Sequence, residues 1–92
     1  MEKYRKELAV MEEKLRAIKK DLHLIEEPLQ LEIQKHLTAM YEMVESIRLN
    51  IDKLEDIKPK TPTFLFKMAE KGVLAQLKTL DTTIGFCIKL AN

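Results

Sequence analysis

The strongest constraint on the fold is a repeated interval of three and four residues between apolar side chains. In residues 1–25 this series consists of Met1, Tyr4, Leu8, Met11, Leu15, Ile18, Leu22 and Ile25. Such spacing places every member on one side of a helix and is typical of the a and d positions of a coiled coil. The first segment is therefore predicted to be a helix with one narrow apolar seam.

The same spacing returns twice further along the chain. The second series is Ile33, Leu37, Met40, Val44, Ile47, Ile51 and Leu54, and the third is Phe66, Val73, Leu77, Leu80, Ile84, Cys87 and Ala91. Residues 58–63 hold two prolines and no large apolar side chain, which predicts a loop between the two. Gly72, Gly85 and the threonines at 82–83 lower the helix propensity of the third segment. A strand over 82–90 is an alternative, but no second strand-like stretch exists to pair with it.

These patterns predict one all-α domain over residues 1–92, built from amphipathic segments at about 2–27, 29–58 and 62–90. The 34% of charged residues and the two glycines agree with this class. Pro28 leaves two arrangements open. A turn there gives an antiparallel helical bundle or coiled-coil-like hairpin. A kink there gives one long helix across the first two segments, whose apolar face would need a second chain to cover it.

No set of side chains in the sequence predicts catalysis, a cofactor or a metal. His36 follows Glu32 by four residues and shares a helix face with it, but two ligands do not complete a zinc site. Cys87 falls on the third seam, where a free cysteine acts as a small apolar residue. The paired carboxylates lie on charged helix faces and are predicted to be solvated. We therefore predict a non-enzymatic protein without catalytic, cofactor-binding or metal-binding residues.

The charge pattern favours neither nucleic acid nor membranes as a main partner. Net charge is only +1, so there is no overall basic signal. Lys67, Lys71 and Lys78 follow a rough helix face that could contact phosphates, which gives the alternative of a small nucleic-acid-associated regulator. The longest uncharged run spans seven residues, Thr82 to Ile88, too few to cross a membrane. A single cysteine permits no intrachain disulfide, so a reducing cytoplasmic compartment is expected.

The third segment is apolar around more of its girth than the other two. A helix of this kind has to be buried on more than one side, and a three-helix monomer covers each helix on about two sides. We therefore predict a small assembly or adaptor protein that buries helix faces in a homo-oligomer, most simply a dimer, or in a protein partner. The predicted interface residues are Leu65, Leu74, Phe86, Ile88 and Leu90.

Overall fold

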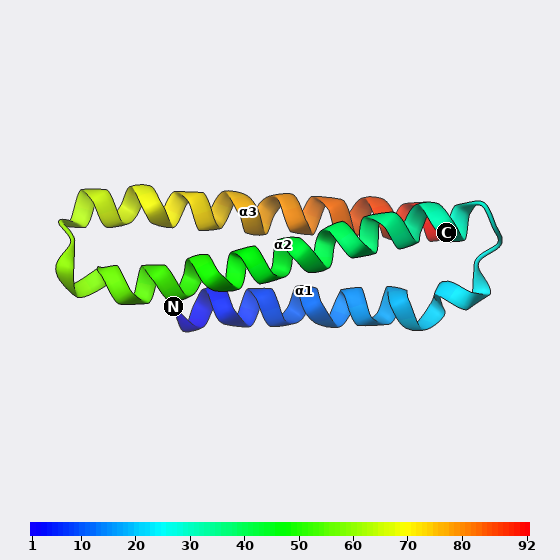
Figure 1. Cartoon of the computed structure of the whole chain (residues 1–92), viewed down its shortest axis with the longest axis horizontal. Coiled ribbons are helices and arrows are strands. Elements are labelled where there is room, and N and C mark those ends of the chain that lie inside the picture. The colour runs from blue at the N-terminus through cyan, green and yellow to red at the C-terminus, as the bar shows by residue number, and fades with distance from the viewer.

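A computed structural model describes all 92 residues of the chain as three helices joined by two short turns. The elements are α1 (Glu2–Asp21), the 3-10 turn η1 (Leu22–Leu24), α2 (Leu29–Ile57), the 3-10 turn η2 (Lys58–Lys60) and α3 (Thr63–Ala91). Successive helices run antiparallel and lie side by side (Figure 1), within Cα extents of 51 × 17 × 16 Å. The predicted all-α helical bundle is confirmed, and residues 82–90 are helical rather than a strand.

The chain turns back before Pro28 instead of continuing through it as one kinked helix. Helix α1 ends at Asp21, and Ile25 is extended, with φ −99° and ψ 135°. Gln30 Nε2 donates a 3.1 Å hydrogen bond back to the carbonyl oxygen of Leu22, which ties the start of α2 to the end of α1. Helix α2 begins directly after Pro28, which lacks an N–H and suits the start of a helix. The first helix is consequently shorter than the predicted segment 2–27.

The core consists of the three predicted seams facing one another. All 17 buried residues are apolar, and none is polar or charged. They are Tyr4, Leu8, Met11, Leu15 and Ile18 from α1, Ile33, Leu37, Met40, Val44, Ile47, Ile51 and Leu54 from α2, and Val73, Leu77, Leu80, Ile84 and Cys87 from α3. Met1, Leu22, Ile25 and Phe66 from the predicted series pack partly buried against this core, whereas Ala91 is exposed.

Helix α1 is shorter than its neighbours, with 20 residues against 29 in each of α2 and α3. The turn between α2 and α3 therefore extends beyond the N-terminus of α1, where no third helix covers it (Figure 1). The hydroxyl of Tyr4, near the start of α1, donates a 2.5 Å hydrogen bond to Glu70 Oε2. Glu70 therefore marks the level of α3 at which α1 begins to cover it. Helices α2 and α3 make the most extensive contact in the molecule.

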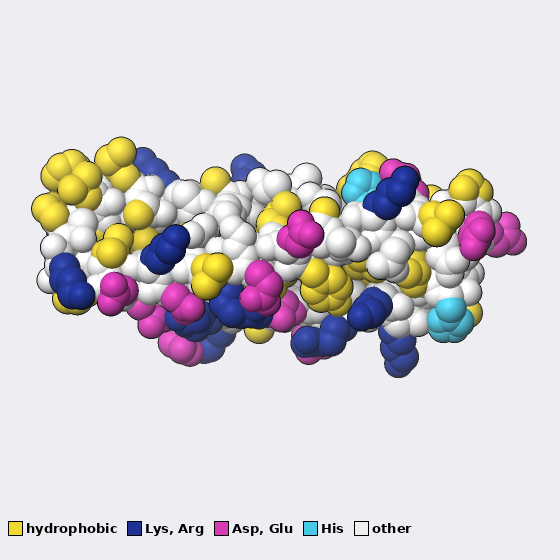
Figure 2. All heavy atoms as spheres, in the orientation of Figure 1, with side chains coloured by type: hydrophobic (Ala, Val, Ile, Leu, Met, Phe, Trp, Pro, Cys, Tyr) yellow, Lys and Arg dark blue, Asp and Glu magenta, His cyan; other side chains and the backbone are white.

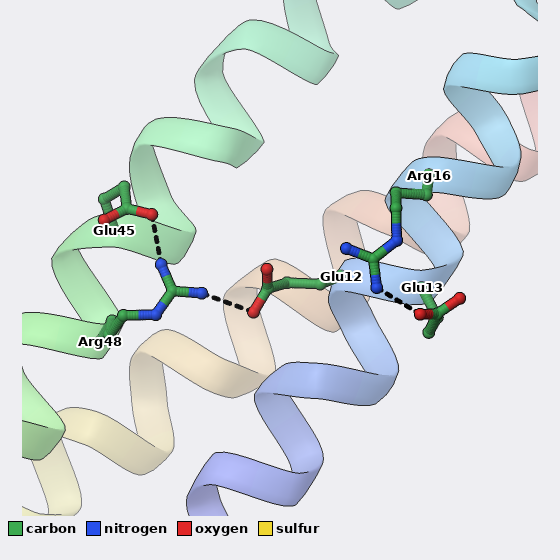
Figure 3. Close-up of polar contacts among 5 residues, drawn as sticks. All are labelled: Glu12, Glu13, Arg16, Glu45 and Arg48. Atoms are coloured by element: carbon green, nitrogen blue, oxygen red, sulfur yellow. Dashed lines mark hydrogen bonds and ion pairs between the residues drawn. The ribbon is translucent and has the colours of Figure 1, made fainter.

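Ion pairs line the borders along which α1 meets the other two helices. Arg5 Nη2 lies 2.7 Å from both Asp52 Oδ1 and Glu55 Oε1 of α2. Arg48 of α2 pairs with Glu12 at 2.6 Å and also with Glu45 on its own helix (Figure 3). Lys14 lies 3.7 Å from Asp81 of α3. These pairs identify the edges of α2 and α3 that face α1, and so also the face of α2 and α3 that points away from it.

Candidate interaction surface

The outward-pointing positions of α3 on the side nearer α2 carry almost no charge. One heptad row lies opposite the buried seam and a second lies beside it towards α2, and together they contain Leu65, Met68, Gly72, Ala75, Thr79, Thr82, Phe86 and Lys89. All eight residues are exposed, and only Lys89 is charged. The corresponding rows of α2 hold Glu32, Lys35, Ala39, Glu42, Ser46, Leu49, Lys53 and Asp56, five of which are charged. We call the eight α3 residues the outer stripe; its composition is unusual for a helix surface in water.

The outer stripe has large apolar side chains near its ends and short ones between them. Leu65, Met68 and Phe86 are 44%, 64% and 50% exposed. A Cβ atom added at Gly72 would meet nothing within 4 Å, so packing inside the monomer does not require this glycine. The Thr79 hydroxyl donates a 3.0 Å hydrogen bond to the carbonyl oxygen of Ala75. Because this hydroxyl already has a partner, covering Thr79 would leave it satisfied.

The five interface residues predicted from sequence fall on different sides of α3. Leu65 and Phe86 belong to the outer stripe, and Leu90 is half-buried against the core. Leu74 and Ile88 share a heptad row on the edge that borders α1, where Ile88 lines a shallow hollow with Ile18 and Ile25. The five residues therefore do not form one continuous surface.

The sequence-based prediction missed most of the outer stripe. It omitted Met68, which is more exposed than any of the five residues it named, and all the short side chains between the two ends. The usable signal was the spacing of uncharged residues at 65, 68, 72, 75, 79, 82 and 86, which alternates between three and four.

Neutral polar contacts join α2 and α3 on the side away from α1. Asn50 Nδ2 donates a 2.8 Å hydrogen bond to Gln76 Oε1, and Gln76 Nε2 donates a 3.4 Å bond to Ser46 Oγ. Further along, the His36 and Phe86 rings meet edge to face, with centroids 5.6 Å apart and an interplanar angle of 83°. We call the surface formed by the outer stripe and this neighbouring edge of α2 the back face.

Charged side chains are unevenly distributed over the side of the bundle that Figure 2 shows. In Figure 2, Lys, Arg, Asp and Glu gather along the border of α1 and α2 in the lower half, whereas the band across α2 and α3 carries few of them. A shallow hollow between α2 and α3 near Gly72 is lined partly by Asn50, Ala69 and Gln76, with Lys53 and Asp56 on its α2 side. The back face is therefore broad and slightly hollowed, with almost no charge on its α3 half and more charge on its α2 half.

Titratable side chains with shifted pKa values lie away from the back face or below it. Cys87 is fully buried, and burial raises the pKa of its thiol, which keeps it protonated. The hydrogen bond from Tyr4 to Glu70 is the main cause that raises the pKa of Tyr4 to about 12, and burial of the phenol is the second cause.

The two histidines do not form part of a metal site. His36 Nε2 lies 3.4 Å from Glu32 Oε1, and His23 Nδ1 lies 3.0 Å from the carbonyl oxygen of Lys20. No group of three or more His, Cys, Asp and Glu side chains is placed to hold a metal ion.

The three lysines considered for phosphate contact lie on one edge of α3. Lys67, Lys71 and Lys78 are exposed there, and none of them forms an ion pair in the monomer. This edge adjoins the outer stripe without being part of it.

The sequence matches no protein-family model, and neither the curated proteins nor the solved structures contain a significantly similar chain. None of the three helices is long and apolar enough to span a bilayer.

Proposed function

We propose that this chain is a small assembly or adaptor protein that works by burying its back face against a second copy or another protein. The observation that supports the proposal is the outer stripe, which keeps Leu65, Met68 and Phe86 in solvent and has only one charge in eight positions. Large apolar side chains held in solvent on a nearly uncharged helix face are a mark of an interaction site on a small protein.

The energetic reason follows from the burial of these side chains. Fully burying a Leu, Met or Phe side chain gains about 1.5–3 kcal/mol, and each of these three is roughly half exposed in the monomer. Association therefore recovers a substantial part of this energy. The short side chains between them let a partner approach α3 closely, so that the large side chains at both ends are covered together.

The test is a charge placed at the centre of the stripe. Ala75 is exposed, so Ala75→Glu should leave the monomer folded, since glutamate is a good helix former. In the assembly the same carboxylate would be buried without a partner. We expect unchanged helicity by circular dichroism but loss of the assembled species in sedimentation velocity.

Ala9→Glu is the matched control, because Ala9 is also exposed but lies on α1, away from the back face. It should leave the sedimentation profile as in the wild type. If both variants assemble as the wild type does, the outer stripe is not the interaction surface.

A second candidate function, a nucleic-acid-associated regulator, is supported by the unpaired Lys67, Lys71 and Lys78. Lysines that contact phosphates release counterions, so binding would fall steeply as salt increases. Titration with a fluorescent duplex at 20 and 150 mM salt tests this candidate. Absence of binding at the lower salt concentration would exclude it.

A further inference from the structure

Building on the proposed function, we infer that the back face is occupied by a second copy of this chain in an antiparallel twofold dimer. In this arrangement α3 packs on α3 and α2 packs on α2, with the dyad crossing the bundle at the level of Gln76. Three features of the two helices support this geometry, and the last two concern the same pair of residues on α2.

The first feature is the symmetry of one heptad row of the outer stripe, formed by Leu65, Gly72, Thr79 and Phe86, about its midpoint. Leu65 and Phe86 are equidistant from a point between Ala75 and Gln76, and Gly72 and Thr79 share the same midpoint. When a second copy is turned end for end about this point, Leu65 of each copy lies against Phe86 of the other. In this row the large side chains then meet at both ends and the short ones at the centre, while Met68 of each copy lies at the level of Thr83 of the other.

The second feature is a pair of outward-pointing charged residues on α2 that is centred at the same height. Glu42 and Lys53 are outward-pointing residues of α2, and their midpoint lies between Ile47 and Arg48. The Gln76 side chain bonds to both Ser46 and Asn50, which bracket this point. One twofold axis at this level therefore relates Leu65 to Phe86 on α3 and Glu42 to Lys53 on α2.

The third feature is charge complementarity across that axis. Glu42 and Lys53 are eleven residues apart, about 16 Å along the helix, so they cannot pair within one copy. Neither takes part in any ion pair of the monomer. The twofold axis places Glu42 of each copy opposite Lys53 of the other. Lys71 and Lys78 approach their counterparts only at the solvent-exposed rim, where salt screens them.

The available area matches a stable dimer. Helix α3 has 29 residues and is about 43 Å long, and two helices side by side are about 20 Å wide, which gives a face of roughly 850 Å². A standard protein interface buries about 800 Å² of each partner. The back face is therefore large enough for a second copy without any contribution from α1.

Reversal of the charged pair tests the orientation. Lys53→Glu or Glu42→Lys alone should weaken the dimer about three- to thirty-fold, since each change affects two symmetric pairs. The combined variant restores opposite charges across the axis and should return the Kd to within about twofold of the wild type. If the combined variant dimerises as poorly as the single ones, or if the single changes have no effect, the antiparallel arrangement is wrong.

Disulfide trapping provides a second, independent measurement in a Cys87→Ala background. An equal mixture of Leu65→Cys and Phe86→Cys chains should give mainly the mixed disulfide under mild oxidation, identified by its mass. Predominant crosslinking of each variant to itself would indicate a parallel dimer, which overturns this inference and leaves the proposed function standing. A wild-type chain that is monomeric and yields no crosslinks would also overturn this inference, and would leave another protein as the only partner under the proposed function.

Discussion

The hydrogen bond between Tyr4 and Glu70 should make the attachment of α1 to α3 sensitive to alkaline pH. Tyr4 is buried near the N-terminus of α1, and its hydroxyl lies 2.5 Å from a carboxylate oxygen of Glu70. Ionising the phenol would lose this donor and place two negative charges side by side. The Tyr4→Phe substitution removes the bond but keeps the ring in the core, which isolates the contribution of the hydroxyl.

The magnitude follows from the displaced pKa. The rise of the Tyr4 pKa from 10.0 to about 12 corresponds to roughly 2.7 kcal/mol at 1.36 kcal/mol per pH unit. Glu70 is partly exposed, and solvent screening lowers this figure, so we expect Tyr4→Phe to cost about 1–2 kcal/mol. Because the pKa is higher in the folded state than in the unfolded state, this stabilisation is fully present below pH 10 and is lost as pH rises towards 12.

Urea unfolding of the wild type and Tyr4→Phe, followed by circular dichroism at several pH values, measures the difference directly. The gap in unfolding free energy should be constant from pH 7 to 9 and should shrink between pH 10 and 12. The comparison cancels the effects of lysine deprotonation, which both proteins share. A gap below 0.3 kcal/mol at pH 7, or one that grows with pH, would refute the reasoning.

Two further predictions concern the core. Leu15→Asp or Ile47→Asp should unfold the bundle, because each site is fully buried and a lone buried carboxylate costs about as much as a small domain's whole stability of ~5 kcal/mol. Lys20 is exposed, so Lys20→Ala should change the unfolding free energy by less than about 0.5 kcal/mol. If the buried-site variants and Lys20→Ala had equal melting temperatures, the assignment of Leu15 and Ile47 to the buried seams would be wrong. Cys87 should react with a thiol reagent only as fast as the chain opens, because its sulfur is buried and protonated. Labelling as fast as that of an unfolded peptide would show that α3 is not docked.

The helical core could be predicted from sequence because a heptad series fixes which side of each helix is buried. The fully buried residues of α2, from Ile33 to Leu54, are those that the spacing indicated. Such a pattern is redundant, since seven positions all indicate the same face. Single features such as a turn have no such redundancy, and the sequence therefore left Pro28 open between a turn and a kink.

The interaction surface could be predicted only in part, because exposure depends on where the neighbouring helices lie. The sequence shows that α3 is rich in apolar residues, but it does not show on which side α1 docks. Leu74 and Ile88 were grouped with Phe86 by hydrophobicity alone, and the structure places them at the border with α1. The relative heights of α2 and α3 likewise needed the Gln76 hydrogen bonds to Ser46 and Asn50, which no spacing rule supplies.

Light scattering combined with small-angle X-ray scattering on the wild-type chain tests most directly whether the back face is buried in a side-by-side assembly. At high micromolar concentration we expect twice the 10.8 kDa chain mass, in a particle whose length stays close to the 51 Å of one bundle while its cross-section grows. A mass of 10.8 kDa at every concentration, or a dimer about twice as long as one bundle, would contradict it.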